Sequence, residues 1–135
     1  MTKNLTDNLF QDVQVAVVIP CFKVTKQIVN VISAVPSGVW RIYIIDDACP
    51  DGSGKMVNKN VTDPRAKVIF HSKNLGVGGA VITGYKAAIL DGADVIVKVD
   101  GDGQMDPLLI PDFIFPIIIG EADYTKGNRF FDLEE

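Results

Sequence analysis

Two carboxylates and an amide oxygen occur on alternate residues of the segment Asp100-Gly101-Asp102-Gly103-Gln104. Three hard oxygen donors of this kind can converge on one divalent cation. Mg²⁺ suits such a partial cage, because it keeps positions open for water and substrate phosphates. Asp and Gly are also common in solvated turns, so a metal site and a plain turn both stay open. An EF-hand calcium loop is excluded, because Pro111 stands where its bidentate Glu is required.

A second acidic pair, Asp46-Asp47, ends an apolar run and opens a turn that continues through Asp51-Gly52-Ser53. A carboxylate at this place could accept an N–H group from a nucleobase or bind a ribose hydroxyl. It could equally belong to the N-cap network of the next helix, for which Asp and Ser are favoured residues. The sequence leaves these two interpretations equal.

A glycine-rich segment, Asn74-Leu75-Gly76-Val77-Gly78-Gly79-Ala80, precedes the longest helical pattern of the chain. Its glycines, Gly76 first among them, allow close approach of the backbone to a ligand at the positive helix end. Packing of the helix on a sheet is the alternative. A dinucleotide-binding fingerprint is excluded, because the residues after the first apolar run, Pro20-Cys21-Phe22-Lys23, contain no glycine. A phosphate-binding loop is also excluded, because Gly84 is followed by Tyr85 rather than by Lys and Ser or Thr.

Three other reactive side chains are given no chemical role. His71 is the only histidine in the chain, and we assign it to a strand end rather than to catalysis. Cys21 and Cys49 lack metal-ligand spacing and are interpreted as small buried residues in a reducing, cytoplasmic setting.

Regular elements must position these residues. Four β-branched runs predict strands, at 13–20, 40–46, 66–71 and 95–100, and helical patterns lie between them at 24–34, 53–60 and 77–91. In the last helix we expect one buried face made of Val77, Val81, Tyr85, Ala88 and Ile89. The alternation predicts an α/β fold with a mostly parallel sheet and helices on both faces. Ligands bind beyond the carboxyl ends of such strands, where the polar segments above fall.

The composition excludes two further classes of function, nucleic-acid binding and passage through a membrane. The chain has 135 residues, of which 47% are hydrophobic, and a formal net charge of -4. Without runs of Lys or Arg, it has no electrostatic footprint for nucleic acid. The apolar run at 108–119 is broken by prolines, is shorter than the ~20 residues of a membrane-spanning helix and is assigned to the core. Residues 1–12 are predicted to be a polar leader, and residues 13–135 one domain.

Taken in order, four motifs resemble those of the family-two glycosyltransferases, which have the GT-A fold. The motifs are VVIP, IDD-x-x-x-DGS, N-x-G-x-GGA and D-x-D-x-Q-x-DP, and the resemblance extends over residues 13–131. It is greatest to the branch that makes polyprenyl-phosphate sugars, such as the dolichol-phosphate mannose synthases. The resemblance implies inverting transfer of a sugar from a nucleoside-diphosphate sugar to an acceptor such as a lipid phosphate, assisted by Mg²⁺ or Mn²⁺.

The resemblance also implies roles for individual residues. Asp100 and Asp102, on either side of Gly101, would be the metal-binding DXD motif, with Gln104 completing the ligand set. The residues implied in donor binding are Pro20 and Phe22 at the nucleoside, Asp46 and Asp47 at the base or ribose, Gly76, and Arg129 at a phosphate.

This sequence departs from the family pattern in two respects. Members commonly have Pro-x-Tyr-Asn-Glu where this chain has Pro20-Cys21-Phe22-Lys23-Val24, which leaves the donor base open. Members are also commonly longer, so we expect a truncated GT-A domain that carries the donor-binding half, with the catalytic base beyond Glu135. Such a fragment would be inactive by itself and prone to self-association.

Two other functions remain in competition. A nucleotidyltransferase would require a glycine-rich loop and a basic residue directly after the first strand, which residues 21–24 do not supply. A nucleotide-binding or assembly module without catalysis is the second. We further expect the parent protein to be cytoplasmic, with any membrane association provided by segments outside this sequence.

Overall fold

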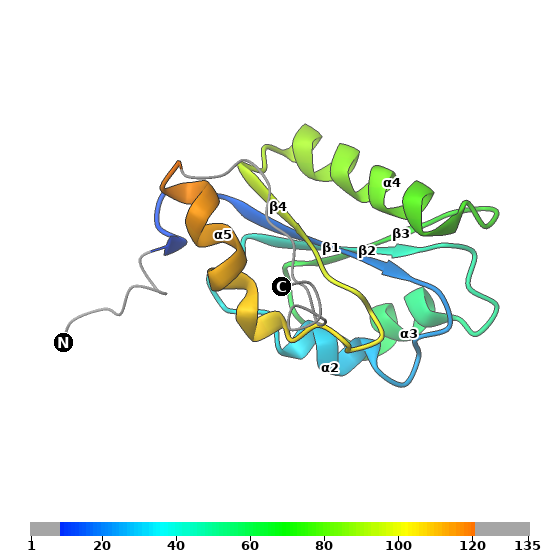
Figure 1. The fold of residues 1–135 in the computed structure, drawn as a ribbon. Helices are drawn as coiled ribbons and strands as arrows, with labels where there is room; N and C mark the ends of the chain where they lie inside the picture. The colour runs from blue at the N-terminus through cyan, green and yellow to red at the C-terminus, as the bar shows by residue number, and fades with distance from the viewer. Residues whose placement is uncertain (1–8, 121–135) are drawn as a thin grey trace, which may run out of the picture.

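The chain folds as a parallel sheet with helices on both of its faces. The computed structural model describes residues 9–120, which contain a four-stranded sheet with the order β3-β2-β1-β4 (Figure 1). The strands are β1 (Val15–Cys21), β2 (Arg41–Asp46), β3 (Ala66–Phe70) and β4 (Val95–Lys98). All of their pairings are parallel. The predicted α/β class is therefore confirmed.

The two central strands, β1 and β2, form the buried centre of the sheet. The side chains of Val15–Ile19 and of Ile42–Ile45 have no exposed surface. Strands covered on both faces require continuous apolar runs rather than alternating ones, and these are the runs seen in the sequence. The outer strands β3 and β4 have partly exposed positions.

Three helices cover one face of the sheet and one helix covers the other within residues 9–120 (Figure 1). The first group is α2 (Ile28–Ser33), α3 (Ser53–Asn60) and α5 (Ile110–Ile118), which follows the 3-10 turn η1 (Pro107–Leu109). The opposite face packs on α4 (Gly76–Asp91). The three crossovers, through α2, α3 and α4, each leave the carboxyl end of one strand and return to the amino end of the next, so the loops after the strands gather at one edge of the sheet.

The expected buried face of α4 is confirmed at Ala88 and partly at Tyr85, but it is wrong at Val77 and Ile89. The buried residues of this helix are Ala80, Gly84 and Ala88, whereas Val77 and Ile89 are 61% and 65% exposed. The small residues recur every four positions and let the helix approach β1 closely, which larger side chains would prevent. The helix then ends at Gly92, which adopts the left-handed conformation with φ of 104°.

Two other expectations need correction. The apolar run at 108–119 is core only in part, because Ile110 and Ile114 are buried while Leu108 and Phe115 remain exposed. Of the predicted leader at 1–12, residues 1–8 lie outside the described part, but Leu9 and Phe10 pack against the core. Among residues 9–120, no helix combines the length and the apolar character needed to cross a bilayer.

The close approach of α4 to β1 makes a testable prediction. A Cβ atom on Gly84 would overlap Cγ1 of Val18 and lie 3.0 Å from its Cγ2. Gly84→Ala should therefore lower the free energy of unfolding by ~1–3 kcal/mol, as other overpacked core substitutions do. Urea denaturation followed by circular dichroism measures this change.

Gly78→Ala is the matched control on the same helix, because a Cβ atom there meets nothing within 4 Å. This substitution should leave stability unchanged or raise it by up to ~1 kcal/mol through helix propensity. Equal effects of the two alanines would contradict the packing described here.

Candidate functional site

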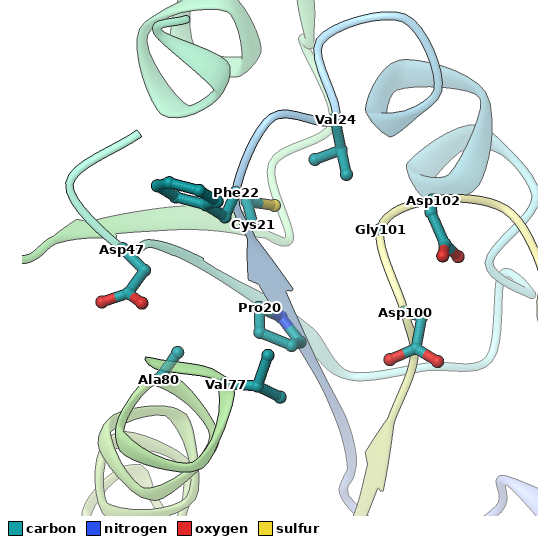
Figure 2. Close-up of a pocket in the computed structure, with 10 residues that line it drawn as sticks. All are labelled: Pro20, Cys21, Phe22, Val24, Asp47, Val77, Ala80, Asp100, Gly101 and Asp102. Atoms are coloured by element: carbon teal, nitrogen blue, oxygen red, sulfur yellow. The ribbon is translucent and has the colours of Figure 1, made fainter. Parts of the chain in front are cut away.

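The loops at the carboxyl ends of β1, β2 and β4 and the first turns of α4 enclose a pocket of about 160 Å³. Figure 2 shows Phe22 and Asp47 on one side, Asp100 and Asp102 on the other, and Pro20 between them. Gly101, predicted to be part of the same site, also lines it. The chain thus brings together residues that lie up to 82 positions apart, from Pro20 to Asp102.

The two pocket carboxylates on the loop after β4 differ in their surroundings. Asp100 is about half exposed, and its Oδ1 lies 2.9 Å from Nζ of Lys98. Asp102 is exposed, and its Oδ1 accepts a hydrogen bond from the backbone N–H of Gln104 at 3.0 Å. Gln104 itself is exposed and does not line the pocket.

Gly101 holds this loop against the core. It is buried, and a Cβ atom on it would lie 3.2 Å from Cγ2 of Val24 and 3.4 Å from Cγ2 of Ile19. A larger residue would have to displace these side chains. The close contact therefore fixes the backbone from which Asp100 and Asp102 project.

The chemistry of the donor set fits a divalent cation that shares its ligands with a substrate. Residues 9–120 contain no group of three or more His, Cys, Asp or Glu that could enclose a metal by itself. Two carboxylates are, however, a common set of protein ligands for Mg²⁺ when phosphate oxygens and water complete its coordination. Lys98 would compete with such an ion for Oδ1 of Asp100.

Asp46 is buried and forms the N-cap network that the sequence analysis held as one of two interpretations. Its Oδ1 accepts the N–H of Cys49 at 2.7 Å, and its Oδ2 accepts the N–H of Gly54 at 2.8 Å. A Cβ atom on Gly54 would lie 2.6 Å from that same Oδ2. Asp46 therefore fixes the start of α3, and it does not line the pocket.

Asp47 lines the pocket and is also bound to α4. Its Oδ1 accepts the N–H of Leu75, and its Oδ2 accepts the N–H of Gly76, both at 2.8 Å. Oδ1 also lies 2.8 Å from Nδ1 of His71. Burial alone would raise the pKa of this carboxyl, but the hydrogen bonds from His71, Leu75 and Gly76 outweigh it and hold the pKa below its ordinary value. Asp47 is therefore an ionised acceptor at neutral pH.

Gly76 has the backbone freedom expected of it, with φ of +83°, but its N–H points to Asp47. It does not line the pocket. Val77 and Ala80, which follow it on α4, line the pocket instead. The sequence analysis missed both, because neither is polar and only the direction of the helix places them there.

The two cysteines have different environments. Burial, followed by the nearby Asp46 and Cys49, raises the pKa of the Cys21 thiol to about 12. Cys49 is partly exposed, which corrects its interpretation as a buried residue. Burial would raise its pKa, but hydrogen bonds from Ser53 and from backbone amides, including that of Lys23 at 3.1 Å, lower it.

Arg129, which the sequence analysis assigned to a phosphate, lies outside the described residues.

Comparisons with known proteins place this geometry in a family. A family model for glycosyl transferase family 2 matches residues 16–135. A UDP-N-acetylglucosamine–dolichyl-phosphate N-acetylglucosaminyltransferase of Methanococcus voltae is 33% identical over 92% of this chain and 55% of its own length. An undecaprenyl-phosphate mannosyltransferase of Micrococcus luteus is 33% identical over 65% of this chain and 36% of its own length. The chain thus spans about half or less of the length of these relatives.

A solved structure has a similar fold. Glucosyl-3-phosphoglycerate synthase from Mycobacterium tuberculosis, in complex with Mn²⁺, UDP and glucosyl-3-phosphoglycerate, is 18% identical, with a TM-score of 0.65 over 86% of this chain and 43% of that one. At this identity the likeness concerns the fold, which is the expected GT-A type. The match of the family model over almost the whole sequence, together with the two relatives, shows that the chain belongs to glycosyl transferase family 2, in its polyprenyl-phosphate branch.

Proposed function

We propose that the protein transfers a sugar from a nucleoside-diphosphate sugar to a polyprenyl phosphate, with inversion at the anomeric carbon. The observation that carries this proposal is the pocket in which an exposed aromatic ring and a buried carboxylate lie opposite two further carboxylates, of which Asp100 is half exposed and Asp102 is exposed (Figure 2). Family membership supports sugar transfer. The lipid acceptor is supported by the two relatives, whose names specify dolichyl phosphate and undecaprenyl phosphate.

In this proposal the two sides of the pocket hold different parts of the donor. Phe22, which is 42% exposed, lies against the nucleoside, and Asp47 accepts a hydrogen bond from its base or ribose. Pro20 lies between the two sides. Asp100 and Asp102 face the diphosphate and would hold Mg²⁺ or Mn²⁺, with Gln104 of the same loop as a further ligand.

The chemistry that a divalent cation supplies there is neutralisation of the charge that develops on the leaving nucleoside diphosphate. The Mn²⁺ bound in the related fold supports this choice of ion. The protein's own share is to keep two carboxylates on a short loop whose backbone is fixed by Gly101. An acidic chain can in this way bind an anionic donor without many basic residues.

The size of the pocket supports the proposal that residues 9–120 hold only part of the donor. Its volume of about 160 Å³ lies below the ~300–1,000 Å³ of typical ligand sites. We propose that Arg129 contacts a phosphate and that the catalytic base and the acceptor site belong to a part of the protein beyond Glu135. Residues 13–135 would then be the donor-binding half of the domain, in a cytoplasmic protein that reaches the membrane through other segments.

The proposed function first predicts that the chain binds the nucleotide-sugar donor. Calorimetric titration of the chain with UDP-, GDP- and dTDP-sugars should detect one nucleotide whose affinity increases when Mn²⁺ is present. Binding should be weak without the metal, because the two carboxylates then repel the diphosphate. Affinity for none of the three nucleotides, both in this chain and in the full-length protein, would refute the proposed function.

The metal site predicts the behaviour of Asp102→Asn. This change keeps the shape of the side chain but removes a charged ligand, so it should weaken donor binding mainly in the presence of Mn²⁺. A loss of about tenfold or more is expected for one charged contact. Asp112→Asn removes the same charge from the exposed surface of α5 and should have no effect. Equal metal dependence in wild type and Asp102→Asn would contradict the site.

We also propose that the isolated chain self-associates. On α4, Ile82, Ile89 and Leu90 are 54%, 65% and 87% exposed, and such apolar side chains favour contact with another surface. Light scattering should therefore give a mass above that of one chain. A mass of 14.7 kDa at all concentrations would contradict this prediction.

A further inference from the structure

His71 is a titratable residue in contact with the pocket residue Asp47, and the proposed function does not use it. Its ring lies between two elements: Nδ1 is 2.8 Å from Oδ1 of Asp47, and Nε2 is 2.8 Å from Oγ1 of Thr83 on α4. The side chains of His71 and Asp47 are only 9% and 5% exposed. The imidazole thus joins the carboxyl end of β2 to the third turn of α4, with little exposure to solvent.

The donors and acceptors around His71 determine whether Nδ1 of its ring carries a hydrogen. The ionised carboxylate of Asp47 can only accept, so Nδ1 must be the donor. Thr83 has one hydroxyl proton and two acceptors near it, Nε2 of His71 and the carbonyl oxygen of Gly79 at 3.1 Å. Whether the hydroxyl donates to the ring or to the carbonyl, Nδ1 stays protonated.

The contacts of Asp47 leave it little acceptor capacity. An ionised carboxylate offers about four lone-pair sites. Oδ1 uses two of them, for His71 and for Leu75, and Oδ2 uses one for Gly76. The remaining site is on Oδ2, and Asp47 lines the pocket. A ligand N–H or O–H group that reaches this carboxylate must therefore use Oδ2.

We propose that His71 is a positioning residue for the nucleoside of the donor. By occupying Oδ1, it fixes the rotation of the Asp47 carboxylate and leaves one acceptor position for the ligand. This inference rests on the proposed function of the pocket, and it adds a residue that does not itself line the pocket. His71 acts on the nucleoside side alone, because its partner Asp47 directly follows β2 and its partner Thr83 lies on α4, away from the loop of Asp100 and Asp102.

The proton assignment can be tested without any substitution. Since the chain contains a single histidine, its ring nitrogens give one set of ¹⁵N signals in a long-range proton–nitrogen spectrum. We expect Nδ1 to be protonated in the folded protein at neutral pH. An unprotonated Nδ1 would overturn the proposal, because the ring could then not donate to Asp47.

The positioning role is tested with two variants and two ligands. His71→Phe keeps a ring of similar size but cannot donate, whereas the side-chain amide of His71→Asn places an N–H group where Nδ1 stood. With Mn²⁺ present, affinity for the nucleoside diphosphate that binds the wild type should fall about tenfold or more in His71→Phe and recover largely in His71→Asn. Affinity for pyrophosphate, which lacks the nucleoside, should be unchanged in both variants.

The outcomes separate this inference from the function on which it rests. Equal loss of nucleotide and pyrophosphate affinity, or no recovery in a folded His71→Asn variant, would mean that His71 only stabilises the fold. Unchanged nucleotide affinity in His71→Phe would mean that Asp47 needs no orientation by the ring. If the wild-type protein binds no nucleotide at all, the proposed function fails first and this inference fails with it.

Discussion

The end of β2 is the point on which both layers of helices depend. Adjacent residues of a strand face opposite sides of the sheet, so Asp46 and Asp47 serve opposite layers. Asp46 accepts one amide in the turn after β2, that of Cys49, and one in the first turn of α3, that of Gly54, whereas Asp47 accepts two amides at the start of α4. Both carboxylates are almost completely buried, where an unpaired charge would be costly. Their hydrogen bonds therefore fix the positions of both helices relative to the strand, and with them one wall of the pocket.

Much of the fold could be predicted because its signals are local. Continuous β-branched runs predicted all four strands, and the order of strands and helices predicted a parallel sheet with its polar loops at one edge. The buried face of α4 could not be predicted from the same pattern. It depends on the distance between helix and sheet, which Gly84 and Val18 set by direct contact. Hydrophobicity alone favours Val77 and Ile89 at such an interface, and both are exposed.

The parts of the site whose residues are close in sequence could be predicted. The contacts between elements that are distant in sequence could not. The acidic loop of residues 100–104 could be recognised as a unit. The different roles of Asp46 and Asp47 depend on which face of the sheet each side chain points to, and two identical adjacent residues in a sequence do not reveal this. The partners of His71 lie 24 and 12 residues away and belong to different elements. A strand-end histidine gives no sign of them until the parallel sheet and α4 are both in place.

The ion pair between Lys98 and Asp100 has a consequence for selectivity among cations. The ammonium group already supplies one positive charge at 2.9 Å from the carboxylate. A sodium or potassium ion would offer no more charge than the group it displaced, and it would have to give up part of its hydration as well. A doubly charged ion gains about twice the Coulomb energy at the same distance. The lysine on β4 thus competes with an incoming ion for Oδ1 of Asp100, and a singly charged ion gains least from displacing it.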